Sequence, residues 1–224
     1  MSNLAEAEKA FDDMGGQPCV LEAGVMIQTE ISVVLARGAD GSVVAYPPSE
    51  NIHRNGILDV SIVPARISAE IGARATQIAT SVAEKLDCCG VMAVEFFITQ
   101  DGELLVNEVA PRPHNSGHYT LDSCATSQFE QQVRTLCGLP LGDAALLSPA
   151  VMVNVLGDLW NGNQAPPWDQ VLTHPRAKLH LYGKRDARPS RKMGHYTVLG
   201  ESVGQALSSA LAIQNSISRG GPYK

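Results

Sequence analysis

An Asp-Gly pair between two apolar, alternating runs constrains the fold of this chain more than any other feature, and it lies within residues 94–109. Asp-Gly flanked by such runs is the strongest short-range signal for a β-hairpin. We take Asp101 and Gly102 as a two-residue turn. Counting outward along both strands then places Glu95 opposite Glu108.

The facing pair Glu95 and Glu108 predicts a bound cation. Directly opposed side chains share one face of a sheet, with Cβ atoms about 5 Å apart. The same register puts Phe97, Leu104 and Val106 on that face, and the opposite face is also apolar, so we expect burial on both faces. Two negative charges about 5 Å apart repel by roughly 3 kcal/mol at an effective dielectric of 20. Either one carboxyl is protonated or a cation lies between them, and Mg²⁺ with oxygen ligands fits best. The alternative is a surface hairpin with two solvated glutamates.

A loop with functional residue types follows the hairpin. Residues 110–118 hold two prolines, a glycine and an Asn-Ser pair, which is typical of a loop. Binding and catalytic groups often lie on such loops beside a rigid sheet. Arg112 suits a carboxylate or a phosphate, with a structural ion pair to Glu95 or Glu108 as the alternative. For His114 and His118, the alternative to a functional role is that they are ordinary loop histidines.

These runs resemble a known family. The run Val-Glu-Phe-Phe at residues 94–97 and the run from Leu105 to His118 resemble the metal-binding end of the ATP-grasp ligases. The segment Pro-Arg-Pro-His-Asn-Ser-Gly-His at residues 111–118 is specific to one branch, the 5-(carboxyamino)imidazole ribonucleotide synthases of purine synthesis. The resemblance covers nearly the whole chain in order, including blocks at residues 30–33, 46–53, 127–130, 138–142, 154–157 and 181–195.

The resemblance implies a nucleotide site and a metal site. ATP would lie with its adenine against a hinge strand, and a downstream carboxylate would bind the ribose hydroxyls. Glu95 and Glu108 would hold Mg²⁺ on the terminal phosphates. Asn107 adjoins Glu108, and strict alternation points its side chain to the other face, so either the strand ends there or Asn107 acts through its backbone. The residues that match nucleotide-binding positions are Glu22, Ala23, Gly24 and Val25 in the hinge, then Glu30, His53, Asn107 and Glu108.

The resemblance also implies an acceptor site. The family's reaction uses ATP and bicarbonate to form carboxyphosphate, whose CO₂ is captured by the amine of 5-aminoimidazole ribonucleotide. Arg112, His114 and Asn115 match catalytic positions of the family, where cations surround carboxyphosphate and water is kept out. Lys184 and Arg191 match its contacts to the ribonucleotide phosphate. From charge alone, the stretch 184–192 would read as a solvated basic loop.

Residues that resemble the first part of such an enzyme are not found in these 224 residues. Those parts are a Rossmann-like domain, two phosphate-binding lysines and a glycine-rich lid. The resemblance therefore covers about the last three-fifths of the family's length, and we expect these residues alone not to turn over. A catalytically silent module that binds nucleotide or Mg²⁺ is the alternative from another class. A formate-using ATP-grasp transformylase is the alternative among enzymes.

Composition limits the classes of binding partner and the cellular compartment that we expect for this chain. The net charge of −6 argues against nucleic acid and anionic membranes as partners. Five cysteines without a Cys-x-x-Cys spacing favour free thiols in a reducing cytoplasm. No signal peptide and no apolar run of membrane-spanning length is visible. We expect a cytoplasmic protein with small-molecule substrates, and by resemblance a homodimer at full length.

The pattern of elements predicts an α+β fold. We expect an antiparallel sheet with helices, the second half of an ATP-grasp domain, over residues 1–145. A small β-rich C-terminal domain would follow over residues 146–224. Periodicity predicts helices over 4–13, 68–87, 127–137 and 201–217 and strands over 18–25, 29–37, 42–46, 59–63, 150–156, 177–182 and 194–199.

Overall fold

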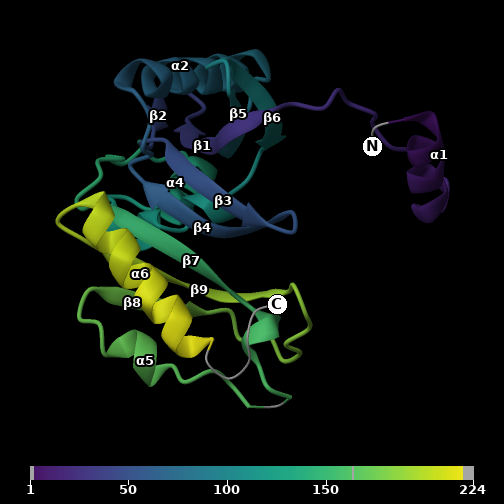
Figure 1. Cartoon of the computed structure of the whole chain (residues 1–224). Helices are drawn as coiled ribbons and strands as arrows, with labels where there is room; N and C mark the ends of the chain where they lie inside the picture. The colour runs from purple at the N-terminus through teal and green to yellow at the C-terminus, as the bar shows by residue number, and fades with distance from the viewer. Residues whose placement is uncertain (1–2, 163, 219–224) are drawn as a thin grey trace.

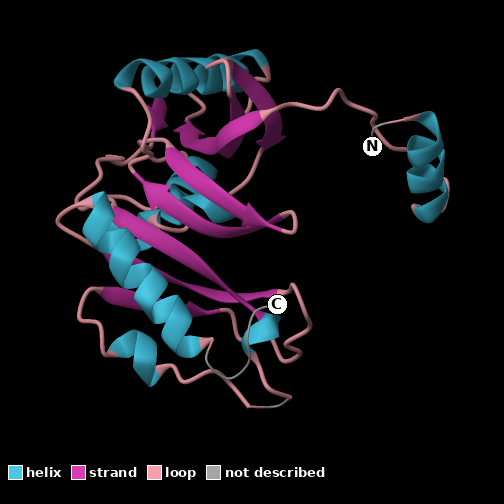
Figure 2. Cartoon of the chain, viewed as in Figure 1, coloured by secondary structure: helices cyan, strands magenta, loops and turns pink. Residues whose placement is uncertain are grey.

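The computed structural model describes residues 3–162 and 164–218, which are built around one antiparallel sheet (Figures 1 and 2). Within these residues the strands pair in the order β6-β5-β1-β3-β4-β7-β9-β8, and β2 pairs with β1. The strands are β1 (Ile27–Arg37), β2 (Val43–Ala45), β3 (Ser49–Arg54), β4 (Ile57–Val63), β5 (Gly90–Thr99), β6 (Leu104–Ala110), β7 (Ala150–Leu156), β8 (Ala177–Leu181) and β9 (Lys192–Leu199). The predicted α+β class is confirmed.

The helices lie on different sides of the sheet, except α1, which stands apart from it (Figures 1 and 2). They are α1 (Leu4–Asp13), α2 (Ala69–Lys85), α3 (Thr120–Ser123), α4 (Gln128–Leu136), α5 (Asp169–Leu172) and α6 (Val203–Ile217), with 3₁₀ turns η1 (Asn115–Gly117) and η2 (Gly157–Leu159). Three of the long helices begin at serines whose side chains accept a backbone N–H of the first turn, namely Ser68, Ser127 and Ser202. Such caps satisfy donors that the helix itself leaves unpaired.

Helix α2 determines which face of the N-terminal strands can carry polar groups. Its buried residues Ala75, Ala79 and Ala83 pack against apolar side chains of β1 and β5. Because side chains alternate along a strand, the residues between these apolar positions point away from α2. Ser32 on β1 and Glu95 on β5 are directly paired there. The face opposite α2 is therefore the polar face of this part of the sheet.

The sheet continues into the C-terminal residues. Strand β7 pairs with β4, and β9 and β8 extend the sheet beyond it. Helix α6 packs on β7 and β9 through Ala206, Ala210, Ile213 and Ile217. The division into residues 1–145 and 146–224 stays a prediction. None of the helices among the described residues is long and apolar enough to span a membrane.

One predicted strand is wrong. Residues 17–26 form no strand and are exposed, so the expected strand over 18–25 is absent from the described structure. Figure 1 shows this segment running out from the sheet to α1, which lies away from the rest of the chain. A strand needs a neighbour for its backbone groups, and within the described residues the one backbone hydrogen bond of this segment is that of the Met26 carbonyl, which accepts from the Gln100 N–H at 3.0 Å. Strand β3, which contains His53, was not predicted.

Candidate active site

The predicted pairing of Glu95 with Glu108 is confirmed, although the path to it differs from the prediction. The turn has three residues rather than two, because the Thr99 N–H donates to the Glu103 carbonyl at 2.9 Å. Gly102 has a φ of 80°, the left-handed conformation that closes such turns. The register then shifts by one residue between Glu95 and Phe96. The longer turn and this bulge offset each other, so the two glutamates still face each other.

The bulge lies at Asn107 and changes the faces of the hairpin. Phe96 pairs with Val106, and the next pair is Glu95 with Glu108, which leaves Asn107 without a partner in the ladder. The sequence left two explanations for Asn107, that the strand ends there or that the residue acts through its backbone. The structure shows a third, a β-bulge, which interrupts the strict alternation of side chains. The placement of Leu104 and Val106 on the glutamates' face is wrong, because the bulge moves both to the face of Phe96.

Burial on both faces is confirmed for β5 but is wrong for β6. Strand β6 is at the edge of the sheet. Its residues Leu105, Val106, Asn107 and Glu108 are exposed, because no strand or helix covers this edge within the described residues. The side chain of Glu95, one strand further in, is 15% exposed. The pair therefore combines one nearly buried carboxylate with one open to solvent.

Glu95 carries an electrostatic cost that a cation would relieve. Burial raises the pKa of the Glu95 carboxyl above its usual range, and the like charges of Glu108 and Glu30 raise it further. The positive charges of His53 and Lys192 act in the opposite direction. Desolvation and like charges both favour the protonated form of a carboxyl. Three carboxylates from three adjacent strands therefore share one polar region.

The predicted ribose ligand Glu30 lies beside the predicted nucleotide contact His53. Glu30 Oε2 is 2.8 Å from His53 Nδ1, and both side chains are partly buried. Glu30 also pairs in register with Phe97, two residues along β5 from Glu95. The sheet thus brings Glu30, His53 and Glu95 together, although each comes from a different strand.

His114 lies against Glu95 as a neutral ring. Its Nε2 is 3.2 Å from Glu95 Oε1, and its Nδ1 accepts from the Ser116 backbone N–H at 3.3 Å. Because Nδ1 accepts, we assign the ring proton to Nε2, which faces the carboxylate. Burial lowers the pKa of His114 to about 4, and the Arg112 charge acts in the same direction. The contact therefore joins a neutral imidazole to a carboxylate and is not an ion pair at neutral pH.

A fully buried glutamine, to which the sequence analysis gave no role, holds this loop in place. Gln128 Oε1 accepts from the His114 N–H at 2.9 Å, and its Nε2 donates to the His114 carbonyl at 2.7 Å. The same Nε2 lies 3.0 Å from Nδ1 of His118. The only sequence signal for Gln128 is that it lies in the block at residues 127–130, which resembles the family. Gln128 fixes the backbone from which Arg112, His114 and Asn115 project.

Asn115 is tied to the C-terminal strands. Its amide exchanges two hydrogen bonds with the amide of Asn154 on β7, at 3.0 and 2.7 Å. Asn154 is buried and also donates to the Leu58 carbonyl at 2.7 Å. Arg112 is exposed and donates to the Pro113 carbonyl at 3.2 Å. Within the described part of the chain Arg112 forms no ion pair with Glu95 or Glu108, so the structural alternative for it is not supported.

The predicted phosphate contacts Lys184 and Arg191 hold their own loop together. Lys184 Nζ donates to the Lys192 carbonyl at 2.6 Å, and Arg191 Nη1 donates to the Asp186 carbonyl at 2.9 Å. Their neighbour Lys192 acts electrostatically on Glu95. Burial lowers the pKa of Lys192, and the charges of Arg112 and Lys184 add to this, while Glu95 opposes it. The sequence analysis included Lys192 in the basic stretch 184–192 and gave it no role.

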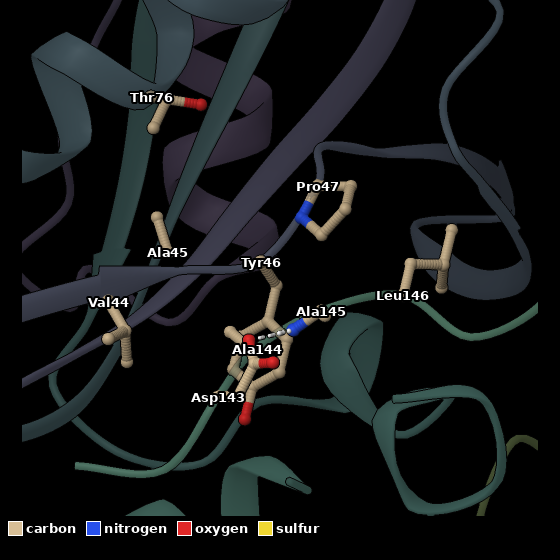
Figure 3. Close-up of a pocket in the computed structure, with 9 residues that line it drawn as sticks. All are labelled: Val44, Ala45, Tyr46, Pro47, Thr76, Asp143, Ala144, Ala145 and Leu146. Atoms are coloured by element: carbon tan, nitrogen blue, oxygen red, sulfur yellow. Dashed lines mark hydrogen bonds between the residues drawn. The ribbon is translucent and has the colours of Figure 1, made fainter. Parts of the chain in front are cut away.

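The structure brings together most predicted site residues but not the hinge. Glu22, Ala23, Gly24 and Val25 lie in the exposed segment before β1 and contact none of the other predicted residues in the described structure. An open hollow elsewhere, between β2, α2 and residues 143–146, contains no predicted site residue (Figure 3). Its polar side chains are engaged locally, since Asp143 accepts from the Ala145 N–H and Thr76 donates to the Gly72 carbonyl.

Two family models and a bacterial relative match this chain. Residues 1–129 match the ATP-grasp domain, and residues 150–209 match the phosphoribosylaminoimidazole carboxylase C-terminal domain. The chain is 49% identical over 195 residues to the N5-carboxyaminoimidazole ribonucleotide synthase of Bacillus subtilis, covering 87% of this chain and 50% of that protein.

Two solved structures are similar over almost the whole chain. The N5-carboxyaminoimidazole ribonucleotide synthetase of Thermus thermophilus has a TM-score of 0.87 at 40% identity, covering 99% of this chain and 59% of that one. The synthase of Aspergillus clavatus, in complex with ADP and 5-aminoimidazole ribonucleotide, has a TM-score of 0.90 at 30% identity, covering 96% and 58%. The chain spans about half the length of the bacterial relatives it matches.

Proposed function

Because this chain belongs to the ATP-grasp family, we propose that it supplies the carboxylate half of an ATP site and the acceptor site of an N5-carboxyaminoimidazole ribonucleotide synthase. The observation that carries the proposal is the convergence of Glu30, Glu95 and Glu108 with His114 and Lys192. Carboxylates for a metal and ribose, beside cations for phosphate, are the groups that phosphoryl transfer needs. A homodimer and a cytoplasmic location remain predictions.

The nucleotide would lie along the polar face of β1, β3 and β5. Glu30 would accept from the ribose hydroxyls, and His53, held against Glu30 at 2.8 Å, would fix the direction of that carboxylate. The backbone of residues 22–25 would contact the base, as the family resemblance implies. Asn107, freed from the ladder by the bulge, would contact the nucleotide beside Glu108.

The residues present fit a magnesium ion. Glu95 and Glu108 offer oxygen ligands at paired positions. Burial, with the charges of Glu108 and Glu30, raises the pKa of Glu95, and a bound cation would oppose this. Held by these two carboxylates, Mg²⁺ would offset the negative charge of the phosphates. His114, whose Nε2 lies 3.2 Å from Glu95 Oε1, would orient that carboxylate for the ion.

The basic side chains indicate how bicarbonate and the acceptor ribonucleotide would be bound. A bicarbonate oxygen would attack the terminal phosphorus of ATP, releasing ADP and forming carboxyphosphate, which breaks down to CO₂ and phosphate. Arg112 and Lys192 would stabilise these anions, and Asn115, fixed by Asn154, would orient bicarbonate. The amine nitrogen of 5-aminoimidazole ribonucleotide would bond to CO₂ and lose one proton. Lys184 and Arg191 would exchange their carbonyl partners for its phosphate.

A chimaera tests the proposal. It joins the part of the Bacillus subtilis relative that precedes the matched region to this chain, and its carboxylation of 5-aminoimidazole ribonucleotide is assayed with ATP and bicarbonate. Glu108→Gln should reduce ATP cleavage by roughly a hundredfold or more, because the ion contributes several kcal/mol to charge stabilisation. Glu103→Gln removes an exposed charge from the same hairpin and should retain activity. Near-normal turnover in the Glu108 variant would remove the metal role. Nucleotide binding without any carboxylation would favour a silent binding module.

A further inference from the structure

A second group of metal-ligating residue types lies outside the site described above. Asp122 comes from α3, His180 from β8 and His195 from β9. One ligand atom of each lies within 4.8 Å of the ligand atoms of the other two. His180 and His195 are directly paired across the two strands, so both side chains point to the same face of the sheet.

His195 has one ring nitrogen without a partner. The residue is 1% exposed, and its Nδ1 lies 2.9 Å from the Tyr182 hydroxyl. Its Nε2 is buried and has no hydrogen-bond partner in the described structure. Buried polar atoms are nearly always paired, so an orphaned imidazole nitrogen calls for a ligand.

We propose that Asp122, His180 and His195 form a metal site of their own, which binds a borderline divalent ion such as Zn²⁺. The site shares no residue with the Glu95–Glu108 pair, and the inference does not depend on the proposed function. Two imidazole nitrogens and one carboxylate oxygen are a donor set that zinc accepts, with a water completing four ligands.

Zinc binding requires side chains of the cluster to rotate. Bonds of 2.0–2.1 Å place tetrahedral donor atoms about 3.3 Å apart. Asp122 Oδ2 and His180 Nε2 are 2.8 Å apart, and no separation in the cluster exceeds 4.8 Å. The His180 and His195 rings are stacked, with centroids 4.6 Å apart and an angle of 18° between their planes. Because the lone pair of an imidazole nitrogen lies in the ring plane, one ring must turn before both nitrogens point at one ion. The ion would replace the proton of the hydrogen bond between Asp122 and His180.

Tyr182 has the position of an outer partner for a ligating histidine. A metal-bound imidazole usually donates its other N–H to a polar group, which fixes the ring orientation. Tyr182 Oη can take this N–H from His195 Nδ1, leaving the lone pair of Nε2 for the metal. Lys184 Nζ lies over the Tyr182 ring, 5.3 Å from its centroid.

Calorimetric titration of the chelator-treated 224-residue chain with ZnCl₂ tests the site. Excess MgCl₂ keeps the Glu95–Glu108 pair occupied. We expect one ion per chain, micromolar or tighter affinity, a raised Tm because zinc binds the folded state, and a tetrahedral ligand-field spectrum with Co²⁺. His180→Ala and Asp122→Asn should abolish this binding. Tyr182→Phe should weaken it roughly tenfold or more.

Control variants separate this site from other sources of zinc binding. His174→Ala removes a histidine outside the cluster, and Glu108→Gln alters the magnesium pair; both should bind zinc as the unaltered chain does. Asp122 and His180 are only partly buried, and circular dichroism verifies that their variants fold. The proposal fails if no saturable zinc binding is measured. It also fails if folded Asp122→Asn and His180→Ala variants bind zinc unchanged.

Discussion

Gln128 shows how a single buried side chain can determine the geometry of the candidate site. Its amide makes three contacts with the loop that carries His114 and His118. The side chain is fully buried, and without its amide the His114 N–H would lose its partner, whereas the His114 carbonyl would keep the Gly117 N–H at 3.0 Å. The neighbouring Gln131 is equally buried and clamps Gly142 instead, at 2.9 and 2.7 Å. The two glutamines are therefore a matched pair on one helix.

Replacing Gln128 with alanine should loosen the His114 loop. We expect the free energy of unfolding to fall by roughly 1–3 kcal/mol, because buried polar groups lose their partners. As water reaches the ring, the pKa of His114 should rise from about 4 toward its usual value of 6.5, which ring NMR signals can follow. Gln131→Ala should cost similar stability and leave the His114 titration unchanged. Equal effects of both variants on His114 would show that Gln128 has no special part in positioning.

At the scale of elements, the hairpin of β5 and β6 depends on two irregularities. The three-residue turn moves the pairing by one position, and the bulge at Asn107 moves it back. A slip of one residue would send side chains to the opposite face. The pairing of Glu95 with Glu108 therefore requires both irregularities, and Gly102 at a φ of 80° closes the turn.

A Gly102→Ala substitution should weaken this hairpin. An added Cβ would meet no atom within 4 Å, so the expected cost of about 1–2 kcal/mol comes from the left-handed backbone alone. Gly72→Ala is the control, because Gly72 lies in α2 where Cβ makes only ordinary contacts at 3.8 Å. That variant should gain about 0.5–1 kcal/mol. Urea unfolding measures both, and a Gly102 variant as stable as the unaltered chain would contradict the account.

At the scale of the whole molecule, the candidate site spans both parts of the chain. Strand β7 pairs with both β4 and β9, which brings Lys192 of β9 close enough to act electrostatically on Glu95 of β5. The reciprocal amide contact of Asn115 with Asn154 reinforces the same junction. Lys192 and Glu95 are therefore electrostatic partners, although 97 positions separate them in the sequence.

A Lys192→Met substitution should raise the pKa of Glu95 further above its usual range. The lysine charge favours the ionised carboxylate, and its loss leaves burial and the charges of Glu108 and Glu30 unopposed except by His53. Carboxyl ¹³C signals followed through a pH titration measure the change. Lys178→Met removes an exposed lysine of β8 and should leave Glu95 as it is. If the titration of Glu95 is the same in both variants, Lys192 does not act on the carboxylate.

The sequence by itself determined the local features of this protein. The four longer helices, most strands and the hairpin of β5 and β6 follow from periodicity, capping serines and an Asp-Gly turn, which act between residues close in the chain. The resemblance added Glu30, His53, His114 and Asn115. The structure brings Glu30, His53 and His114 close to Glu95 and pairs Asn115 with Asn154. The strand over 18–25 failed because an apolar pattern does not supply a neighbour to pair with.

Only the tertiary structure decided the remaining features. The bulge at Asn107 depends on how β6 must fit β5, and the exposure of Glu108 depends on β6 being an edge strand. The roles of Gln128 and Lys192, and the cluster of Asp122, His180 and His195, arise where distant segments meet. Such contacts are set by strand order and packing across the β4–β7 junction. Local patterns carry no information about that order, because they end at the boundaries of each element.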